Sequence, residues 1–357
     1  MAKKDYSSGE NAEFSELELE PEAPLASNLA PDLSSYALSV ETPDIFTEPE
    51  PASMLTAERL LEDKAKPKNP PEGFWRRGVY HLSFGLVNLG DSAKAKARKQ
   101  LDARIAAPLS GGASFVPVLT RKGGVGKTTV TTLIGMAMAR VREDRILAID
   151  ANPDRGTLAE RVKKGTDKTV RDLVNKAGGI NSFSVFSEYV SRDQSRLDVM
   201  ASETDPMISE AFDEGDYNVV ADLASRYYSV CLTDCGTGIV HSVMRAILMR
   251  ANGLVVVSGG SIDEARLASE TLTWLESNGY AELVKNSVVA LNTATFGTQL
   301  VKLEEIEAHF ASRTRAVVRI PYDPQLAAGA TVDFDRLHPA TKQAARDLAA
   351  LVVDGLV

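Results

Sequence analysis

The chain has 357 residues, enough for one large domain or two, and 44% of them are apolar, enough for a hydrophobic core. The net charge of −9 is uneven, because residues 1–75 contain 16 Asp and Glu against 6 Lys and Arg, while the remainder is nearly neutral. This composition argues against a generally basic nucleic-acid-binding protein, and no run approaches the roughly 18 apolar residues of a membrane span, so we expect a cytoplasmic protein without a transmembrane segment.

Residues 1–73 are rich in Glu, Pro, Ser and Ala and keep neither helical nor strand periodicity for long. Such a segment buries too little apolar surface to offset the entropy lost on ordering, so we predict a disordered acidic tail. Residues 74–112 form a connecting segment, in which a basic stretch over 92–105 has helical character. That stretch is either a docking element for an acidic surface, a membrane or a partner, or a solvated helix packed on the domain behind it.

Short Val, Ile and Leu runs alternate with helical segments from residue 113 to residue 357. Helical spacing predicts helices over 127–141 and 262–279, the second closed by Gly279. The apolar runs predict strands over 114–120, 145–150, 197–202, 228–236, 253–260, 287–292 and 316–323. Such runs, separated by helices, are typical of a mostly parallel sheet covered on both faces, so we predict a three-layer α/β/α domain.

The first predicted strand leads into TRKGGVGKTTV, residues 120–130, and then into a helix. A strand, a glycine-rich turn, Lys-Thr-Thr and a helix form the context of a P-loop, whose backbone N–H groups surround phosphates. In such a loop Lys127 neutralises the phosphates and the Thr128 hydroxyl ligates Mg²⁺. The predicted phosphate-binding residues are Gly123, Gly124, Val125, Gly126, Lys127, Thr128 and Thr129. Arg121 stands where a standard P-loop has its first glycine, and Lys122 follows it.

Acidic residues follow two of the predicted strands where those strands end. Asp150 ends one strand, with Asp154 four residues further, and Asp234 lies near the end of another. Ligands of parallel α/β folds bind at the carboxyl ends of the strands, and Mg²⁺ bound with a nucleotide takes carboxylate ligands. We therefore predict Asp150 and Asp234 as metal ligands together with Thr128, the alternative being that each carboxylate only caps a turn.

The string KGGVGKTT, residues 122–129, resembles the deviant Walker A motif of the MinD/ParA group of P-loop ATPases, in which an extra lysine precedes the paired glycines. The pattern of that group continues with the aspartates at the two strand ends, with Gly238 in LTDCGTGI, and with an Asn and a Pro near the adenine, here Asn292 and Pro321. The resemblance covers about residues 113–350. It implies a P-loop ATPase that binds ATP and Mg²⁺.

A narrower resemblance rests on WRRGVYHLSFGLVNLGDSAKAKARKQLDARI, DRILAIDANPDRGTLAERV and PYDPQLAAG. These segments are similar to the MinD-like proteins associated with actinobacterial type VII (ESX) secretion, the EspI group, which also carry an acidic, proline-containing N-terminal region. This resemblance implies a role in regulating or positioning a secretion apparatus. It also implies a secretion component as protein partner, and peripheral recruitment to the membrane by that partner.

The extra lysine implies an ATP-dependent homodimer. In the MinD/ParA group two ATP-bound subunits face each other, and this lysine, here Lys122, reaches the phosphates held by the partner. Charge supplied in this way makes ATP binding and dimerisation depend on each other. The predicted catalytic residues are Lys122, Lys127, Asp150 and Asp154.

The sequence departs from the group at one position. Many members have D-x-D after the second strand, where the second Asp helps to position the attacking water, but this chain has Asn152. The amide of Asn152 can hydrogen-bond a water but cannot accept its proton, so we expect slow hydrolysis. Asp150 and Asp154 are the candidates for positioning the attacking water instead. A nucleotide-binding interaction module without turnover remains an alternative. A second alternative is a ParA-like ATPase that segregates DNA or cargo, with weak support from the scattered Arg313, Arg315, Arg319, Arg336 and Arg346.

Overall fold

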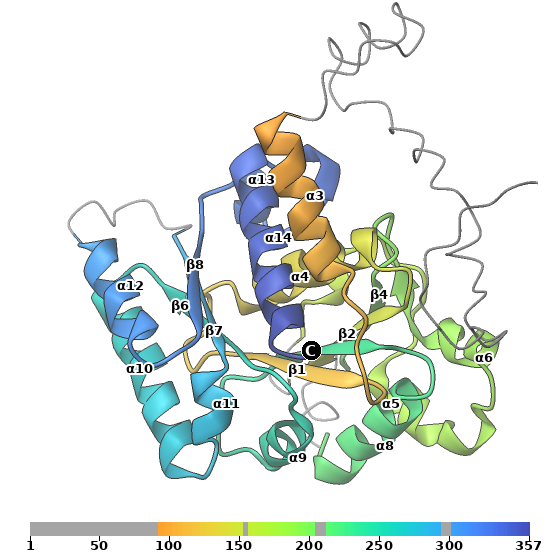
Figure 1. The fold of residues 1–357 in the computed structure, drawn as a ribbon. Helices are drawn as coiled ribbons and strands as arrows, with labels where there is room; N and C mark the ends of the chain where they lie inside the picture. The colour runs from red at the N-terminus through yellow and green to blue at the C-terminus, as the bar shows by residue number, and fades with distance from the viewer. Residues whose placement is uncertain (1–91, 153–155, 204–211, 294–300) are drawn as a thin grey trace, which may run out of the picture. The chain divides into compact units, whose positions relative to one another are not determined.

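The computed structural model describes residues 92–152, 156–203, 212–293 and 301–357. The predicted acidic tail, residues 74–91 of the connecting segment and the candidate catalytic residue Asp154 lie outside these ranges. Within them, eight strands form a sheet in the order β3–β4–β2–β5–β1–β6–β7–β8 (Figure 1). The strands are β1 (Ser114–Leu119), β2 (Ile146–Ala151), β3 (Ser191–Arg192), β4 (Asp198–Met200), β5 (Val230–Cys235), β6 (Val255–Gly259), β7 (Val288–Asn292) and β8 (Ala316–Ile320).

Neighbouring strands are parallel throughout the sheet, except that β3 runs antiparallel to β4. Helices and helical turns connect the strands. They are α3 (Ala93–Ile105), α4 (Lys127–Val141), α5 (Val170–Asn175), α6 (Phe183–Phe186), α8 (Glu214–Ala224), α9 (Ser242–Arg250), α10 (Ile262–Ser277), α11 (Ala281–Lys285), α12 (Leu303–Ala311), α13 (Pro324–Ala327) and α14 (Pro339–Asp354). In the described part of the chain, no helix is both long and apolar enough to cross a membrane.

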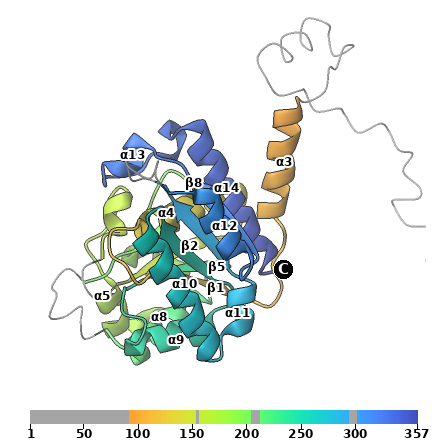
Figure 2. The same ribbon diagram turned by 90° about the vertical axis from the view of Figure 1, so that its left-hand side faces the viewer.

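Alternate residues of the strands enter two cores, one on each face of the sheet. In β1, Val116 and Val118 belong to the core that includes residues of α4 and α14. Phe115 and Leu119 belong to the core that includes residues of α8, α9 and α10. Helices therefore cover both faces of the sheet (Figure 2), which confirms the predicted three-layer α/β/α architecture with a mostly parallel sheet.

All seven predicted strands are present, and α4 has the predicted bounds. Helix α10 ends at Ser277, and Gly279 follows with a φ of 90°, the left-handed conformation that commonly terminates helices. The short edge strand β3 was not predicted, because two residues give no periodic pattern. Its Arg192 donates two hydrogen bonds of 2.7 Å to the buried carboxylate of Asp198 in β4.

Helix α3, the basic stretch of the connecting segment, lies beside α14 (Figures 1 and 2). Its apolar residues Leu101 and Ile105 are buried in the core that includes α4 and α14. The guanidinium of Arg142 closes the end of α3 by donating to the carbonyl oxygens of Ile105, at 2.7 Å, and Ala107, at 2.8 Å. Of the two interpretations of this stretch, packing on the domain behind it is the one observed.

Candidate nucleotide-binding site

The loop between β1 and α4 contains glycines that a side chain would disrupt. Gly124 and Gly126 have φ angles of 78° and 97°, which residues with a side chain rarely adopt. A Cβ atom on Gly126 would also lie 2.3 Å from the Nδ2 atom of Asn292. That amide donates a hydrogen bond of 2.8 Å to the carbonyl oxygen of Val125, so the end of β7 supports the loop. The loop leads into the N-terminus of α4, whose first N–H groups and dipole favour a bound anion.

Three polar side chains meet directly beneath this loop. The ammonium of Lys127 lies 2.5 Å from Oδ1 of Asp234, and the Thr128 hydroxyl donates to Oδ2 of the same carboxylate at 2.6 Å. Burial lowers the pKa of Lys127, but the charge and hydrogen bond of Asp234, with the charge of Asp150, outweigh burial and leave this pKa raised. Lys127 is therefore a buried, charged ammonium at the start of a helix, which suits a phosphate ligand.

The register of the sheet places the two strand-end aspartates side by side, because Asp150 of β2 pairs with Asp234 of β5. Asp150 is buried, and its oxygens accept backbone hydrogen bonds from Asn152, at 3.2 Å, and Leu158, at 3.0 Å. Burial, followed by the nearby charge of Asp234, raises the pKa of Asp150 to about 7. A Cβ atom on Gly156 would lie 2.1 Å from Oδ2 of Asp150 and closer still to Oγ of Ser202, so a larger residue here would displace these side chains. Two adjacent carboxylates and a hydroxyl are ligands of the kind that Mg²⁺ prefers.

A cavity of about 370 Å³ opens over the loop, and it brings the predicted nucleotide-binding residues together. Asp150 and Asp234 are each 1% exposed and lie at the ends of β2 and β5, outside the lining of this cavity. The predicted residues that line it are Lys122, Gly123, Gly124, Val125, Gly126, Lys127, Thr128, Thr129, Asn292 and Pro321. The cavity therefore joins the P-loop to the positions expected near an adenine.

Further lining residues come from the segments after β2, β5 and β8. They lie within the quoted stretches DRILAIDANPDRGTLAERV, LTDCGTGI and PYDPQLAAG, but none of them was predicted as a site residue. They are Thr157, Arg161, Thr237, Asp323, Leu326, Ala327 and Gly329. The carboxylate of Asp323 is buried and accepts backbone hydrogen bonds from Gln325, at 3.0 Å, and His338, at 2.9 Å. Its role is thus to hold the loop between β8 and α14. For the polar members, Thr157, Thr237 and Asp323, the available sequence signal was their position soon after the end of a predicted strand.

Lys122 lies at the rim of the cavity, with its side chain 38% exposed. Its ammonium is 3.8 Å from Oε1 of Glu264, while Oε2 of Glu264 accepts hydrogen bonds from the backbone and hydroxyl of Ser261 at the start of α10. The neighbouring Arg121 is 37% exposed and forms an ion pair of 3.9 Å with Glu270 of the same helix. The two cations are alike in exposure, but only Lys122 lines the nucleotide cavity.

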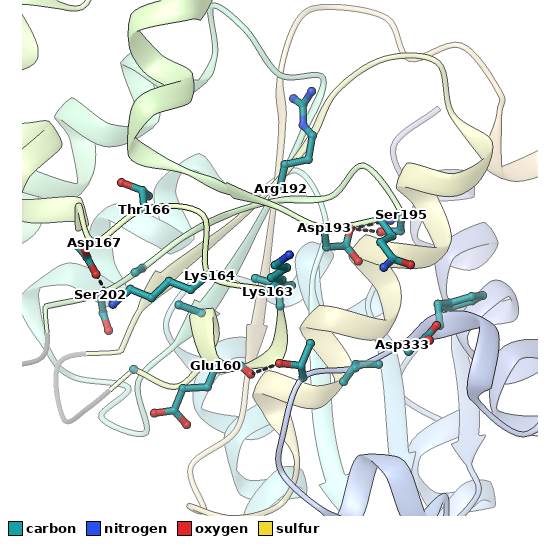
Figure 3. A pocket seen from close by; sticks show the side chains of 18 of the residues that line it. Glu160, Lys163, Lys164, Thr166, Asp167, Arg192, Asp193, Ser195, Ser202 and Asp333 are labelled. Carbon is teal, nitrogen blue, oxygen red and sulfur yellow. Dashed lines mark hydrogen bonds and ion pairs between the residues drawn. The ribbon is translucent and has the colours of Figure 1, made fainter.

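Figure 3 shows a larger cavity, of about 800 Å³. The segment 156–164 contributes different residues to the two cavities: Thr157 and Arg161 line the smaller one, and Glu160 and Lys163 line the larger one. The larger cavity has charged side chains of both signs, and several of them interact within the chain, as Asp193 does with Ser195. It lacks the glycine loop and the helix N-terminus, so the smaller cavity is the candidate site.

The amino-acid sequence matches the CobQ/CobB/MinD/ParA nucleotide binding domain over residues 116–331. The chain is 34% identical over 282 residues to the ESX-1 secretion-associated protein EspI of Mycobacterium tuberculosis. That similarity covers 78% of this chain and 42% of EspI. The chain thus spans about two fifths of the length of the curated relatives it matches.

Solved structures of similar fold include a ParA family ATPase from Chlorobium tepidum, which is 20% identical with a TM-score of 0.56 over 67% of this chain and 98% of that one. The cell division ATPase MinD of Pyrococcus furiosus is 19% identical, with a TM-score of 0.55 over 69% of this chain and 100% of that one. The matched domain spans more than half of the chain and includes the glycine loop, both buried aspartates, Asn292 and Pro321. The chain therefore belongs to the CobQ/CobB/MinD/ParA nucleotide-binding domain family.

Proposed function

We propose that this chain is an ATP- and Mg²⁺-dependent dimerising switch with slow ATPase activity, which regulates or positions a type VII secretion apparatus. The observation that carries the proposal is the meeting of Lys127, Thr128 and Asp234 beneath a glycine loop at a helix N-terminus. A buried ammonium, a hydroxyl and carboxylates in this order suit a nucleotide phosphate with its Mg²⁺ ion.

Each side chain of the site has a role that its position supports. Lys127, now paired with Asp234, would hold the phosphates, and the Thr128 hydroxyl would be a ligand of the metal. Asp234 and Asp150 ligate the metal directly or through its waters. Asn292 and Pro321 flank the adenine. ATP bound with Mg²⁺ supplies the phosphoryl group whose transfer to water ends the ATP-bound state.

Dimerisation is assigned to Lys122, because this cation at the cavity rim is 38% exposed and its ion pair with Glu264 is long, at 3.8 Å, so it can leave that pair and enter a facing subunit. Size-exclusion chromatography with light scattering tests this assignment on the full chain with ATP, with ADP and without nucleotide. We expect a dimer with ATP alone, and a monomer for Lys122→Ala with ATP. Arg121→Ala is the matched control, since it removes a neighbouring cation of the same exposure and should leave the dimer intact. A dimer that persists in Lys122→Ala would overturn the assignment.

Slow hydrolysis is proposed because Asn152, not a carboxylate, lines the cavity after β2. Phosphate release should be measurable in the wild type and reduced in Asp150→Ala and in Asp154→Ala, with Lys127→Ala as the inactive reference. Wild-type release no greater than that of Lys127→Ala would instead favour the second candidate, a nucleotide-binding interaction module without turnover.

The role in secretion is proposed from the similarity to EspI, an ESX-1 secretion-associated protein. Deletion of the gene should reduce export of type VII substrates, and the wild-type chain should restore export where Lys127→Ala does not. Restoration by Lys127→Ala would separate the secretion role from nucleotide binding.

A DNA-binding role receives less support from the arginines that suggested it. Arg313 is bonded to Glu276, Arg319 to Glu307 and Arg346 to Asp102, so their charges are partly compensated within the chain. ATP-dependent DNA binding that weakens steeply with salt would nevertheless favour the segregation alternative.

A further inference from the structure

Arg161 was not predicted as a site residue, yet it lines the nucleotide cavity together with the P-loop. It ends a short 3-10 helix, Ala159–Arg161, in the segment that follows β2. Its carbonyl oxygen accepts a hydrogen bond of 2.8 Å from the N–H group of Val332, which fixes the backbone at this point. A Cβ atom on Gly329, which also lines the cavity, would lie 3.6 Å from the Nη1 atom of Arg161.

The side chain of Arg161 is half-buried, and two of its three nitrogen atoms lack the hydrogen-bond partners that buried donors normally have. Its Nε and Nη1 atoms are both inaccessible to solvent, and neither has a hydrogen-bond partner. A buried charged donor left in this state destabilises a folded protein, so such groups are normally paired. No carboxylate of the described residues lies within ion-pair distance of Arg161, in contrast to Arg142 and Arg192. A hydrogen-bond acceptor for this guanidinium would therefore have to come from a ligand in the cavity that Arg161 lines.

The charges around the cavity indicate the kind of partner. Its ionisable lining residues are the cations Lys122, Lys127 and Arg161 and one carboxylate, Asp323, which is occupied by two backbone N–H groups. Burial lowers the pKa of Arg161, and the charges of Glu160 and Asp234 oppose that effect, which places the guanidinium within electrostatic reach of the proposed metal site. Lys127 and Lys122 are paired with Asp234 and Glu264, so Arg161 is the lining cation of the described residues that has no carboxylate partner, and an anion in the cavity would supply a partner.

We propose that Arg161 binds the phosphate chain of the nucleotide, as a cation supplied by the segment after β2 opposite the P-loop. The inference rests on the proposed nucleotide-binding function and adds a residue to it. A planar guanidinium with adjacent Nε and Nη donors matches two phosphate oxygens, whereas an adenine ring presents no negative charge to it. Arg161 thereby also couples the segment between β2 and α5 to the presence of nucleotide.

Isothermal titration of the full chain with ATP, ADP, inorganic pyrophosphate and adenosine tests this proposal. Arg161→Gln should weaken the binding of ATP, ADP and pyrophosphate at least about tenfold, because a charge-assisted hydrogen bond is lost, and should leave adenosine binding unchanged. Arg161→Lys, which keeps the positive charge but loses the paired donors of the guanidinium, should recover part of the affinity. Lys163→Gln is the matched control, since this exposed cation of the same segment lines the other cavity and should have no effect.

Thermal unfolding separates ligand binding from a structural role. Without nucleotide, the Tm of Arg161→Gln should equal or exceed that of the wild type, because the variant no longer buries an unpaired charge. With saturating ATP, the Tm of the variant should be lower than that of the wild type. A lowered Tm without nucleotide, equal losses for adenosine and ADP, or wild-type affinity in Arg161→Gln would each overturn the role of Arg161. A wild-type chain that binds neither ATP nor ADP would instead overturn the proposed function itself.

Discussion

Asn152 is the residue at which this chain departs most from an efficient ATPase. It lines the nucleotide cavity, and its backbone N–H group donates to Asp150. Under the proposed function, Asn152 is the residue expected to orient the attacking water. Asn152→Asp adds a proton acceptor without changing the size of the side chain. We expect phosphate release at saturating ATP and Mg²⁺ to rise at least about tenfold.

The matched control for this change is Asn181→Asp, an equivalent substitution at an exposed position away from the cavity. It should leave phosphate release unchanged. If Asn152→Asp binds ATP as the wild type does and releases phosphate no faster, the missing carboxylate is not what limits turnover.

Glu264 is placed to compete for Lys122. One of its oxygens lies 3.8 Å from the ammonium of Lys122, and the other caps α10 through Ser261. Glu264→Gln removes the charge but keeps a side chain that can complete the cap. With Lys122 released in both subunits, the ATP-dependent dimer should form at a protein concentration several-fold and at most about thirtyfold lower, because each of the two long ion pairs contributes at most about 1 kcal/mol.

Analytical ultracentrifugation with ATP measures this dimer constant. Glu270→Gln is the control, because it releases Arg121 from the same helix and should leave the constant unchanged. A weaker dimer in Glu264→Gln would mean that Glu264 positions Lys122 for the partner and does not compete for it.

At the scale of elements, α3 depends on one arginine. Arg142 is 4% exposed, donates to the carbonyl oxygens of Ile105 and Ala107, and pairs with Asp144. Arg142→Met keeps the apolar volume and removes these donors, leaving the two carbonyls unsatisfied. The free energy of unfolding should fall by about 2–3 kcal/mol.

Chemical denaturation of the wild type and Arg142→Met measures this difference. Arg140→Met is the control, because Arg140 forms a more exposed ion pair with Asp335 and should cost less than about 1 kcal/mol. Equal losses for the two variants would mean that the buried hydrogen bonds at the end of α3 contribute little.

The elements themselves could be predicted because their causes are local. Strands buried on both faces are continuous apolar runs, and α4 begins at the lysine of the glycine loop, so both kinds of element can be recognised in the sequence. The pairing of Asp150 with Asp234 also follows from strand ends that meet at one edge of a parallel sheet. Arg161 could not be predicted, because its place in the cavity depends on contacts with residues near 330, far along the chain.

At the scale of the whole molecule, the site concentrates charge that the fold alone does not compensate. Asp150 and Asp234 lie on adjacent strands, and the ammonium of Lys127 is bonded to Asp234 alone. The guanidinium of Arg161 has no ion pair among the described residues. Metal and phosphate together would neutralise both sets of charges. The uncompensated charges should therefore lower the free energy of unfolding of the protein without ligand, and binding of nucleotide with Mg²⁺ should raise it strongly.

The proximity of the two buried carboxylates predicts how the free energy of unfolding depends on pH in the absence of nucleotide and Mg²⁺. The pKa of Asp150 is raised from 3.8 to about 7 in the folded chain, so folding favours its protonated form. Its stabilising contribution is therefore complete below about pH 4 and is lost as the pH rises through about 7, with a slope of at most about 1.4 kcal/mol per pH unit. Asp150→Asn cannot ionise and should lack this loss. Urea unfolding in EDTA between about pH 5.5 and about pH 8.5 measures this dependence, and the free energy of unfolding should decline more steeply with pH for the wild type than for the variant. If the two free energies change with pH in parallel, Asp150 is already ionised at neutral pH, held so by Lys127 and by the backbone N–H groups from which it accepts hydrogen bonds.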